Sequence, residues 1–84
     1  MILYHYTDEK NITSILKEGL NPNRIGIVYL TPDPKEMEGY GNTLLRVETG
    51  DLRLTNFEGC EKWEVLCWGK IPPERIEIIA QKDL

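Results

Sequence analysis

The sequence has few of the features that mark a secreted, membrane or nucleic-acid-coating protein. Its two cysteines, Cys60 and Cys67, are too few for a disulfide framework, and no second pair of Cys or His residues completes a zinc site. The formal net charge is −4 and no run of Lys or Arg occurs, so the electrostatic footprint of a nucleic-acid backbone binder is missing. No apolar run is long enough to span a bilayer, and the N-terminus does not read as a signal peptide. These absences predict a cytoplasmic protein with no metal site and no membrane partner.

What is present predicts one small α+β domain covering residues 1–84. Strand-forming residues predict strands at 2–6, 26–31, 43–48, 52–55, 63–68 and 75–80. Apolar residues at three- and four-residue spacing predict one main N-terminal helix of roughly three turns, from a cap at Thr7 or Asp8 to Gly19. The apolar face of that helix, with Ile15 and Leu16, is expected to pack on the sheet. A short second helix is predicted from Asp33, and the order of elements favours a mainly antiparallel sheet.

Glu64 is the residue that most needs an explanation, because it lies among apolar, strand-forming residues. Regular alternation places it on one face with Leu66 and Trp68. A carboxylate in such surroundings has a raised pKa, a cationic partner or a ligand. The simpler interpretation is an exposed position at the start of a strand, or an ion pair with Lys62 or Lys70.

His5 and Tyr29 also have simple interpretations beside functional ones. His5, the single histidine of the chain, shares a strand face with Leu3 and is compatible with a hydrogen-bonded, partly buried side chain. Tyr29 is equally compatible with the core. Whether these side chains converge with Glu64 depends on the tertiary structure.

Several pieces of the chain, in order, resemble the ADP-ribosyltransferase-like family. Residues 5–7 (HYT) are similar to the H-x-T/S start of that family, and residues 12–20 are similar to the helix that often follows. Residues 28–31 (VYLT) resemble the strand with its aromatic or Ser/Thr position. Residues 63–65 (WEV), with the tail at 71–76, resemble the C-terminal strand with its glutamate. These motifs extend over most of the chain, and the resemblance rests on their order and spacing along the sequence.

The resemblance implies a His5, Tyr29 and Glu64 triad in a cleft between two halves of a small split sheet that binds NAD. Glu64 would hydrogen-bond the ribose 2′-hydroxyl and stabilise positive charge as the bond to nicotinamide breaks. Tyr29 would stack on nicotinamide, and His5 would hydrogen-bond a ribose hydroxyl and an amide. The other implied NAD-binding residues are Tyr6, Thr7, Thr31 and Tyr40, and the candidate substrate-recognition residues are Phe57, Glu58 and Glu61.

The leading hypothesis is therefore an NAD-dependent ADP-ribosyltransferase-like enzyme that transfers ADP-ribose to a macromolecular acceptor, a protein or nucleic acid. Lys62 stands where arginine-modifying members have a second acid, which makes arginine a less favoured target. RNA 2′-phosphotransferases depend on basic residues to hold a phosphate, and Arg24, Arg46 and Arg53 form no visible basic set. Two alternatives stay open: a catalytically silent module of the same fold that holds a nucleotide or blocks a partner, and an unrelated α+β domain with a scattered triad.

Overall fold

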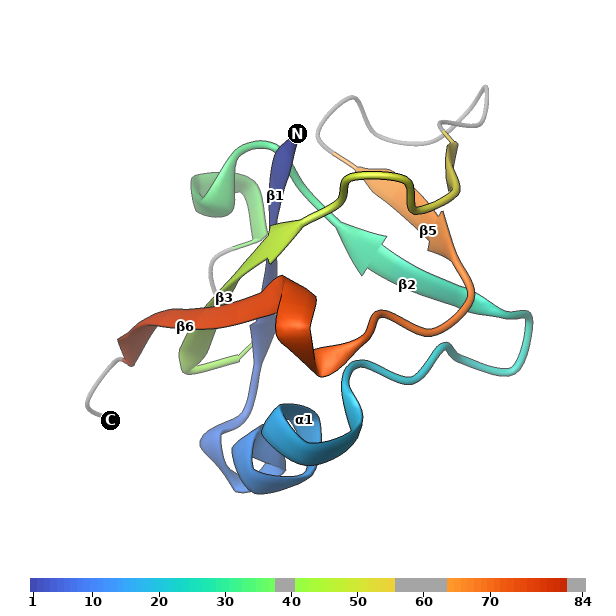
Figure 1. The fold of residues 1–84 in the computed structure, drawn as a ribbon. Helices are drawn as coiled ribbons and strands as arrows, with labels where there is room; N and C mark the ends of the chain where they lie inside the picture. Colours follow the sequence, from blue (N-terminus) through green and yellow to red (C-terminus); the bar gives the residue numbers. More distant parts are fainter. Residues whose placement is uncertain (38–40, 56–63, 82–84) are drawn as a thin grey trace.

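Two antiparallel sheets of three strands each organise the computed structural model, which describes residues 1–37, 41–55 and 64–81. One sheet has the order β1-β3-β6, formed by β1 (Ile2–Thr7), β3 (Thr43–Glu48) and β6 (Ile76–Gln81). The other has the order β2-β5-β4, formed by β2 (Ile27–Leu30), β5 (Val65–Trp68) and β4 (Leu54–Thr55). Figure 1 shows the first sheet on the left and the second on the right.

Within the described residues the chain has a single α-helix, α1 (Ile12–Glu18), and three short 3-10 turns. These turns are η1 (Glu9–Asn11), η2 (Pro34–Met37) and η3 (Pro73–Arg75). No helix of this part of the chain is long and apolar enough to cross a bilayer. The predicted α+β architecture, with antiparallel pairing in two sheets and one main N-terminal helix, is confirmed, while η3 was not predicted. This general architecture does not by itself show the fold implied by the family resemblance.

The main helix is shorter than the sequence predicts and begins later. Thr7 continues β1 and pairs with Thr43 of β3, so it ends the strand and does not cap a helix. Asp8 has the extended backbone usual for a helix cap and caps η1, without a side-chain hydrogen bond, and α1 begins only at Ile12. Ile15 is buried on the core, but Leu16 is 51% exposed, so the prediction that Leu16 packs on the sheet is wrong. Ile15 and Leu16 are consecutive, so their side chains point about 100° apart around the helix, and only Ile15 faces the core.

Gly19 ends α1, as predicted, because its backbone has a positive φ of 89° that favours glycine. The chain then pairs with the segment before η3: Leu20 N donates to Ile71 O at 2.9 Å, and Ile71 N donates to Leu20 O at 3.0 Å. A Cβ atom on Gly19 would collide with the carbonyl of Ile71. The helix is thereby held against the entry to β6.

A single core lies between α1 and the inner faces of both sheets. Strand alternation supplies it: Val28 and Leu30 of β2 are buried, whereas Tyr29 between them is 37% exposed. The buried apolar cluster comprises Leu3, Ile15, Leu20, Val28, Leu30, Leu45, Val47, Cys67, Ile71 and Ile76. Since β1, β2, β3 and β5 all contribute to this cluster, the two sheets share one core, and the candidate site lies where they separate.

Candidate functional site

Among the described residues, one residue pair joins the two sheets by backbone hydrogen bonds. Tyr4 N donates to Thr31 O at 2.8 Å, and Thr31 N donates to Tyr4 O at 2.9 Å. Among the described residues no ladder between β1 and β2 extends this pair, and the two strands diverge from it (Figure 1). His5 and Tyr29, which adjoin the pair, therefore lie at the junction where the two sheets part. We call this junction, formed by Tyr4, His5, Tyr29 and Thr31, the split.

His5 occupies the split and contacts the backbone of the opposite sheet. Because Thr31 bonds β1, the carbonyl of Tyr29, two residues earlier, faces the same edge of β2. His5 Nδ1 lies 2.8 Å from that carbonyl oxygen. A carbonyl only accepts, so Nδ1 carries the proton and Nε2 of the neutral ring is an acceptor. Burial lowers the pKa of His5 from 6.5, and the bond to Tyr29 offsets part of this effect, so the ring is neutral at pH 7.

Tyr29 and Glu64 lie on one face of the sheet formed by β2, β5 and β4. Val65 pairs with Leu30, so Glu64, one position earlier, is level with Thr31 across the same register. Residues at alternate positions of β2 share a face, which places Tyr29, Thr31 and the position of Glu64 together. Glu64 lies directly before β5, at the start of the strand, which agrees with one of the two interpretations of the sequence, but it is half-buried rather than exposed.

His5 approaches from the other face. His5 follows Tyr4 in β1, so its side chain points to the opposite face from that of Tyr4. This is the face of Leu3, and His5 is paired there with Leu45 of β3. Leu3 and Leu45 are fully buried. The imidazole reaches Tyr29 through the gap between the strands. The structure therefore brings His5 to the backbone of Tyr29 and places Glu64 on the face of the Tyr29 ring. No described contact joins all three side chains.

The hydroxyls of Thr7 and Thr31 are used inside the protein. Thr31 is fully buried; its hydroxyl donates to Asp33 O at 3.0 Å and accepts from Asp33 N at 3.1 Å. The Thr7 hydroxyl accepts from Asn11 Nδ2 at 3.2 Å. These bonds stabilise the turns after β2 and β1, and a role of either hydroxyl, or of the buried Tyr6, in binding NAD stays a prediction. The other predicted residues, Tyr40, Phe57, Glu58 and Glu61, lie outside the described residues.

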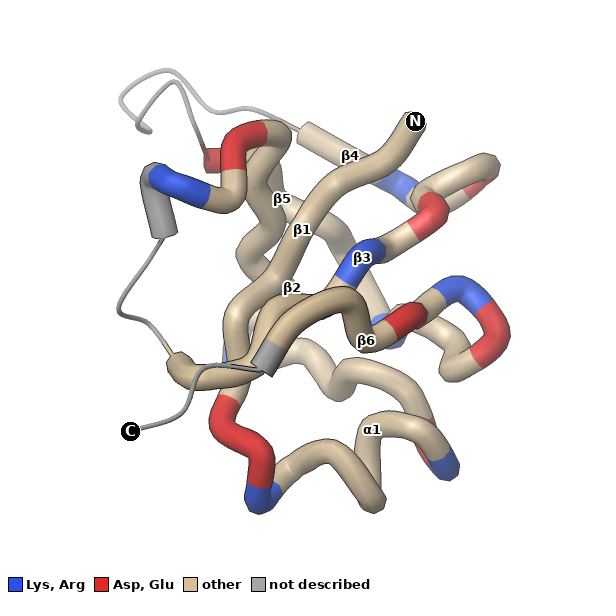
Figure 2. The backbone as a smooth tube through the Cα atoms, turned by 90° about the vertical axis from the view of Figure 1, so that its left-hand side faces the viewer, with Lys and Arg blue, Asp and Glu red and all other residues tan. Residues whose placement is uncertain are grey.

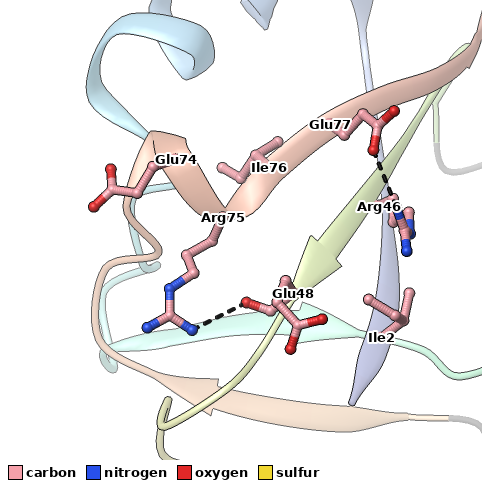
Figure 3. Close-up of a pocket in the computed structure, with 7 residues that line it drawn as sticks. All are labelled: Ile2, Arg46, Glu48, Glu74, Arg75, Ile76 and Glu77. Atoms are coloured by element: carbon pink, nitrogen blue, oxygen red, sulfur yellow. Dashed lines mark hydrogen bonds and ion pairs between the residues drawn. The ribbon is translucent and has the colours of Figure 1, made fainter.

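Two arginines outside the split are committed to carboxylates. Arg46 Nη1 lies 3.1 Å from Glu77 Oε2, and Arg75 Nη2 lies 2.6 Å from Asp51 Oδ1. Both arginines line a pocket on the β1-β3-β6 sheet together with Glu48, whose backbone oxygen accepts from Arg75 at 3.4 Å (Figure 3). Glu74 and Glu77 also line it, so acidic side chains outnumber basic ones, which disfavours a phosphate ligand there.

Positively and negatively charged residues are interspersed along the chain. Figure 2 shows Lys and Arg segments interspersed with Asp and Glu segments along the tube, without a continuous basic stretch in the part of the chain that it colours. Hydrogen bonding to Arg75 lowers the pKa of Asp51, and the N–H of Gly50 lowers that of Glu48, so both carboxylates stay charged at neutral pH. Across residues 1–37, 41–55 and 64–81, no cluster of three His, Cys, Asp or Glu side chains is placed to hold a metal ion.

Comparison with known proteins adds one relative. A curated protein of Archaeoglobus fulgidus, named "Probable RNA 2'-phosphotransferase 2", is 31% identical to the chain over 84 aligned residues. The chain resembles an RNA 2′-phosphotransferase. The match covers 93% of the chain but 39% of the relative, so the chain spans about two fifths of the relative's length. No family model matches the chain.

These comparisons correct the family predicted from the sequence. The resemblance to the ADP-ribosyltransferase-like family rested on short motifs such as residues 5–7 and 28–31, none of them specific. The relative carries the name of a different enzyme class, one that transfers phosphate from RNA, and no model of the predicted family matches. The assignment to the ADP-ribosyltransferase-like family is therefore wrong. Short strand motifs recur in many families because they follow from local strand chemistry.

Sequence reasoning missed one pair of side chains, Arg53 and Trp68. The Arg53 guanidinium carbon lies 5.8 Å from the centroid of the Trp68 ring, a cation–π distance. The sequence signal was weak, because the two residues are 15 positions apart and only the β4–β5 register places them opposite each other.

Proposed function

We propose that the chain takes part in transferring the 2′-phosphate of an RNA to NAD, with NAD bound at the split. The observation that carries this proposal is the similarity to the Archaeoglobus fulgidus protein, which extends over 93% of the chain. The transfer begins when an oxygen of the RNA 2′-phosphate forms a bond to the ribose carbon of NAD. The bond between that carbon and nicotinamide breaks, and nicotinamide leaves with the electron pair. The phosphate is freed from the RNA when a hydroxyl of the ADP-ribose forms a bond to phosphorus and the bond from phosphorus to the RNA 2′-oxygen breaks; that oxygen takes up the proton that the hydroxyl loses.

The residues at the split have the donor and acceptor groups that such a substrate requires. His5 Nε2 has no protein partner among the described residues and is an acceptor for a ribose hydroxyl. The Tyr29 ring is 37% exposed and offers a flat surface on which the nicotinamide ring can stack. Glu64, on the same face, supplies a half-buried carboxylate. Each of these groups has a counterpart on a nicotinamide riboside: a hydroxyl, a flat ring and a ribose that becomes positively charged.

The carboxylate has the central chemical role in this proposal. Loss of nicotinamide leaves positive charge on the ribose, and a carboxylate beside it lowers the energy of that state. Partial burial strengthens the interaction, because fewer water molecules screen it. His5 and Tyr29 act as positioning groups for the ribose and nicotinamide.

A second candidate is a nucleotide-binding module without turnover. The observation in its favour is that His5 approaches from the other face of the sheet and that no described contact joins the side chains of His5, Tyr29 and Glu64. Catalytic groups must meet at one reacting atom, whereas residues that only bind a nucleotide need not.

The test uses purified protein, NAD and a short RNA carrying one internal 2′-phosphate. Nicotinamide release and loss of the 2′-phosphate are followed by chromatography. Glu64→Gln should reduce both rates by about a hundredfold, the order of effect of removing one electrostatic contact to a reacting centre. NAD binding, followed by calorimetry, should change far less.

The matched control is Glu74→Gln, which removes the same charge from an exposed turn beside the other sheet. It should leave both rates unchanged. If Glu64→Gln released nicotinamide and removed the 2′-phosphate at the wild-type rates, the catalytic role of Glu64 would be contradicted. NAD binding by the wild-type protein with no nicotinamide release, with or without RNA, would favour the binding module.

A further inference from the structure

Arg53 and Trp68 form a stacked pair at the outer edge of the β2-β5-β4 sheet. Arg53 directly precedes β4, and Trp68 ends β5. The Arg53 carbonyl accepts the N–H of Trp68 at 2.9 Å, which fixes the two backbones opposite each other. The Arg53 guanidinium carbon then lies 5.8 Å from the centre of the indole. The stack is therefore a consequence of strand register.

The indole is held in place by a neighbouring strand. Trp68 Nε1 donates to Thr55 Oγ1 at 2.7 Å, and Thr55 belongs to β4. A ring fixed by a hydrogen bond and by the ladder offers a rigid platform. A guanidinium stacked on it loses less conformational entropy when a ligand binds.

Arg53 differs from the two arginines of the other sheet in what it contacts. Arg46 and Arg75 each pair with a carboxylate, whereas Arg53 is exposed and pairs with no acidic side chain of the described residues. Stacking on an aromatic face leaves the N–H groups at the guanidinium edge available. That edge matches two oxygens of a phosphate.

The pair lies on the face that carries the proposed site. Thr55 is level with Leu66, and Leu66 is level with Tyr29. Residues level across a sheet share a face, so Arg53, Trp68 and Tyr29 project from the same side. Arg53 is level with Trp68 and Ile27, so its backbone lies about 10 Å across the strands and about 7 Å along them from Tyr29. This separation, roughly 12 Å in all, can be spanned by the arginine side chain together with a nucleotide whose reacting ribose lies at the split.

We infer that Arg53, held on Trp68, binds a phosphate group of the nucleotide substrate. The inference rests on the proposed function, because it assumes a nucleotide at the split. Two sources share this chemistry: the diphosphate of NAD and the phosphate backbone of the RNA. In either case Arg53 supplies the positive charge that binds the phosphate, because Arg46 and Arg75 are already paired with carboxylates.

The experiment measures binding of each source separately, without turnover. NAD is titrated by calorimetry, and a fluorescently labelled single-stranded RNA with an internal 2′-phosphate is titrated by anisotropy. Arg53→Ala should weaken one of the two by about tenfold, the effect of losing one charge-assisted contact. If the RNA is the partner, the slope of log affinity against log salt should become shallower by about 0.7.

Two further variants separate phosphate binding from general effects. Arg46→Ala removes the same charge from the other sheet and should change neither affinity. Thr55→Val frees the Trp68 ring and should weaken the same ligand as Arg53→Ala, though less. Thermal unfolding should be similar for Arg53→Ala and Arg46→Ala, since both side chains are exposed.

Equal binding of both ligands by wild-type protein and Arg53→Ala would overturn the inference and leave the proposed function standing. Wild-type protein that binds neither ligand would overturn the inference as well. Binding that depends on Arg53, without any nicotinamide release, would support the inference and contradict only the catalytic proposal.

Discussion

At the scale of residues, His5 has two structural roles. Its Nδ1–H satisfies the carbonyl of Tyr29 at the position where the two sheets separate, so a side chain replaces a strand as the hydrogen-bond partner. The same bond fixes the tautomer, which leaves Nε2 as the acceptor. Sequence reasoning selected His5 because of its type and position, but the tautomer depends on a residue 24 positions away.

His5 also gives the protein a defined pH dependence. Burial lowers the pKa of His5 in the folded state below the 6.5 of an unperturbed histidine, so the unfolded chain binds the proton more readily. The free energy of unfolding should be fully retained above pH 6.5 and should fall as the pH decreases from 6.5 through the folded-state pKa. Urea unfolding at a series of pH values between 8 and about 5 measures this change.

His5→Gln is the control, because glutamine has no proton to gain. Since the chain has a single histidine, the variant should lose the slope below pH 6.5. The lowered pKa values of Glu48 and Asp51 place their titration below this range. A slope that persists in His5→Gln would assign the pH dependence to other groups.

At the scale of elements, the short helix depends on glycine at its end. Gly19 and Gly26 have nearly the same positive φ, 89° and 88°, but different surroundings. A Cβ at Gly19 would meet the backbone of Ile71, whereas a Cβ at Gly26 would meet nothing within 4 Å. The pair separates the cost of backbone conformation from the cost of close packing.

Gly19→Ala should therefore destabilise the protein more than Gly26→Ala. The positive φ alone should cost about 1–3 kcal/mol in each variant, and Gly19, with ψ of −169°, lies in a region that is essentially restricted to glycine. Gly19→Ala should lose a further ~1–3 kcal/mol, because α1 must move away from Ile71. Equilibrium unfolding in urea measures both, and equal losses would show that the contact with Ile71 does not restrict residue 19.

Strands with a clear alternation of side chains, and helix ends with a glycine or proline signal, were predicted well from the sequence. The strands at β1, β2 and β3 have clear alternation, and Gly19 and the Asp33-Pro34 turn mark the ends of helices. The start of α1 was predicted too early because β1 extends to Thr7 and the first turn after Asp8 is the 3-10 turn η1. The strand containing Glu64 was predicted too long, since the ladder with β2 begins at Val65.

At the scale of the whole molecule, one core holds two sheets that share a single pair of hydrogen-bonded residues, Tyr4 and Thr31, within residues 1–37, 41–55 and 64–81. Leu30 is fully buried next to that pair, and it packs in the same cluster as Leu3 and Leu45 of the other sheet. The joint between the sheets therefore depends on side-chain packing more than on hydrogen bonds.

Leu30→Ala should lower the free energy of unfolding by about 2–5 kcal/mol, the usual cost of a cavity in a well-packed core. Ile25→Ala, at a side chain that is 65% exposed, should change it by less than about 0.5 kcal/mol. Tryptophan fluorescence and far-ultraviolet circular dichroism should give one coincident transition in urea. Separate transitions would indicate that the two sheets unfold independently.

The sequence by itself determined the α+β class, the antiparallel strands, the main helix with its glycine end, and a short set of candidate residues. These features follow from local preferences and from spacing along the chain. Only the tertiary structure decided that His5 bonds the backbone of Tyr29, that Glu64 shares a face with the Tyr29 ring, and that Arg53 stacks on Trp68. Each of these depends on the register between strands distant in the sequence, and register is set by the burial of a shared core rather than by any local pattern.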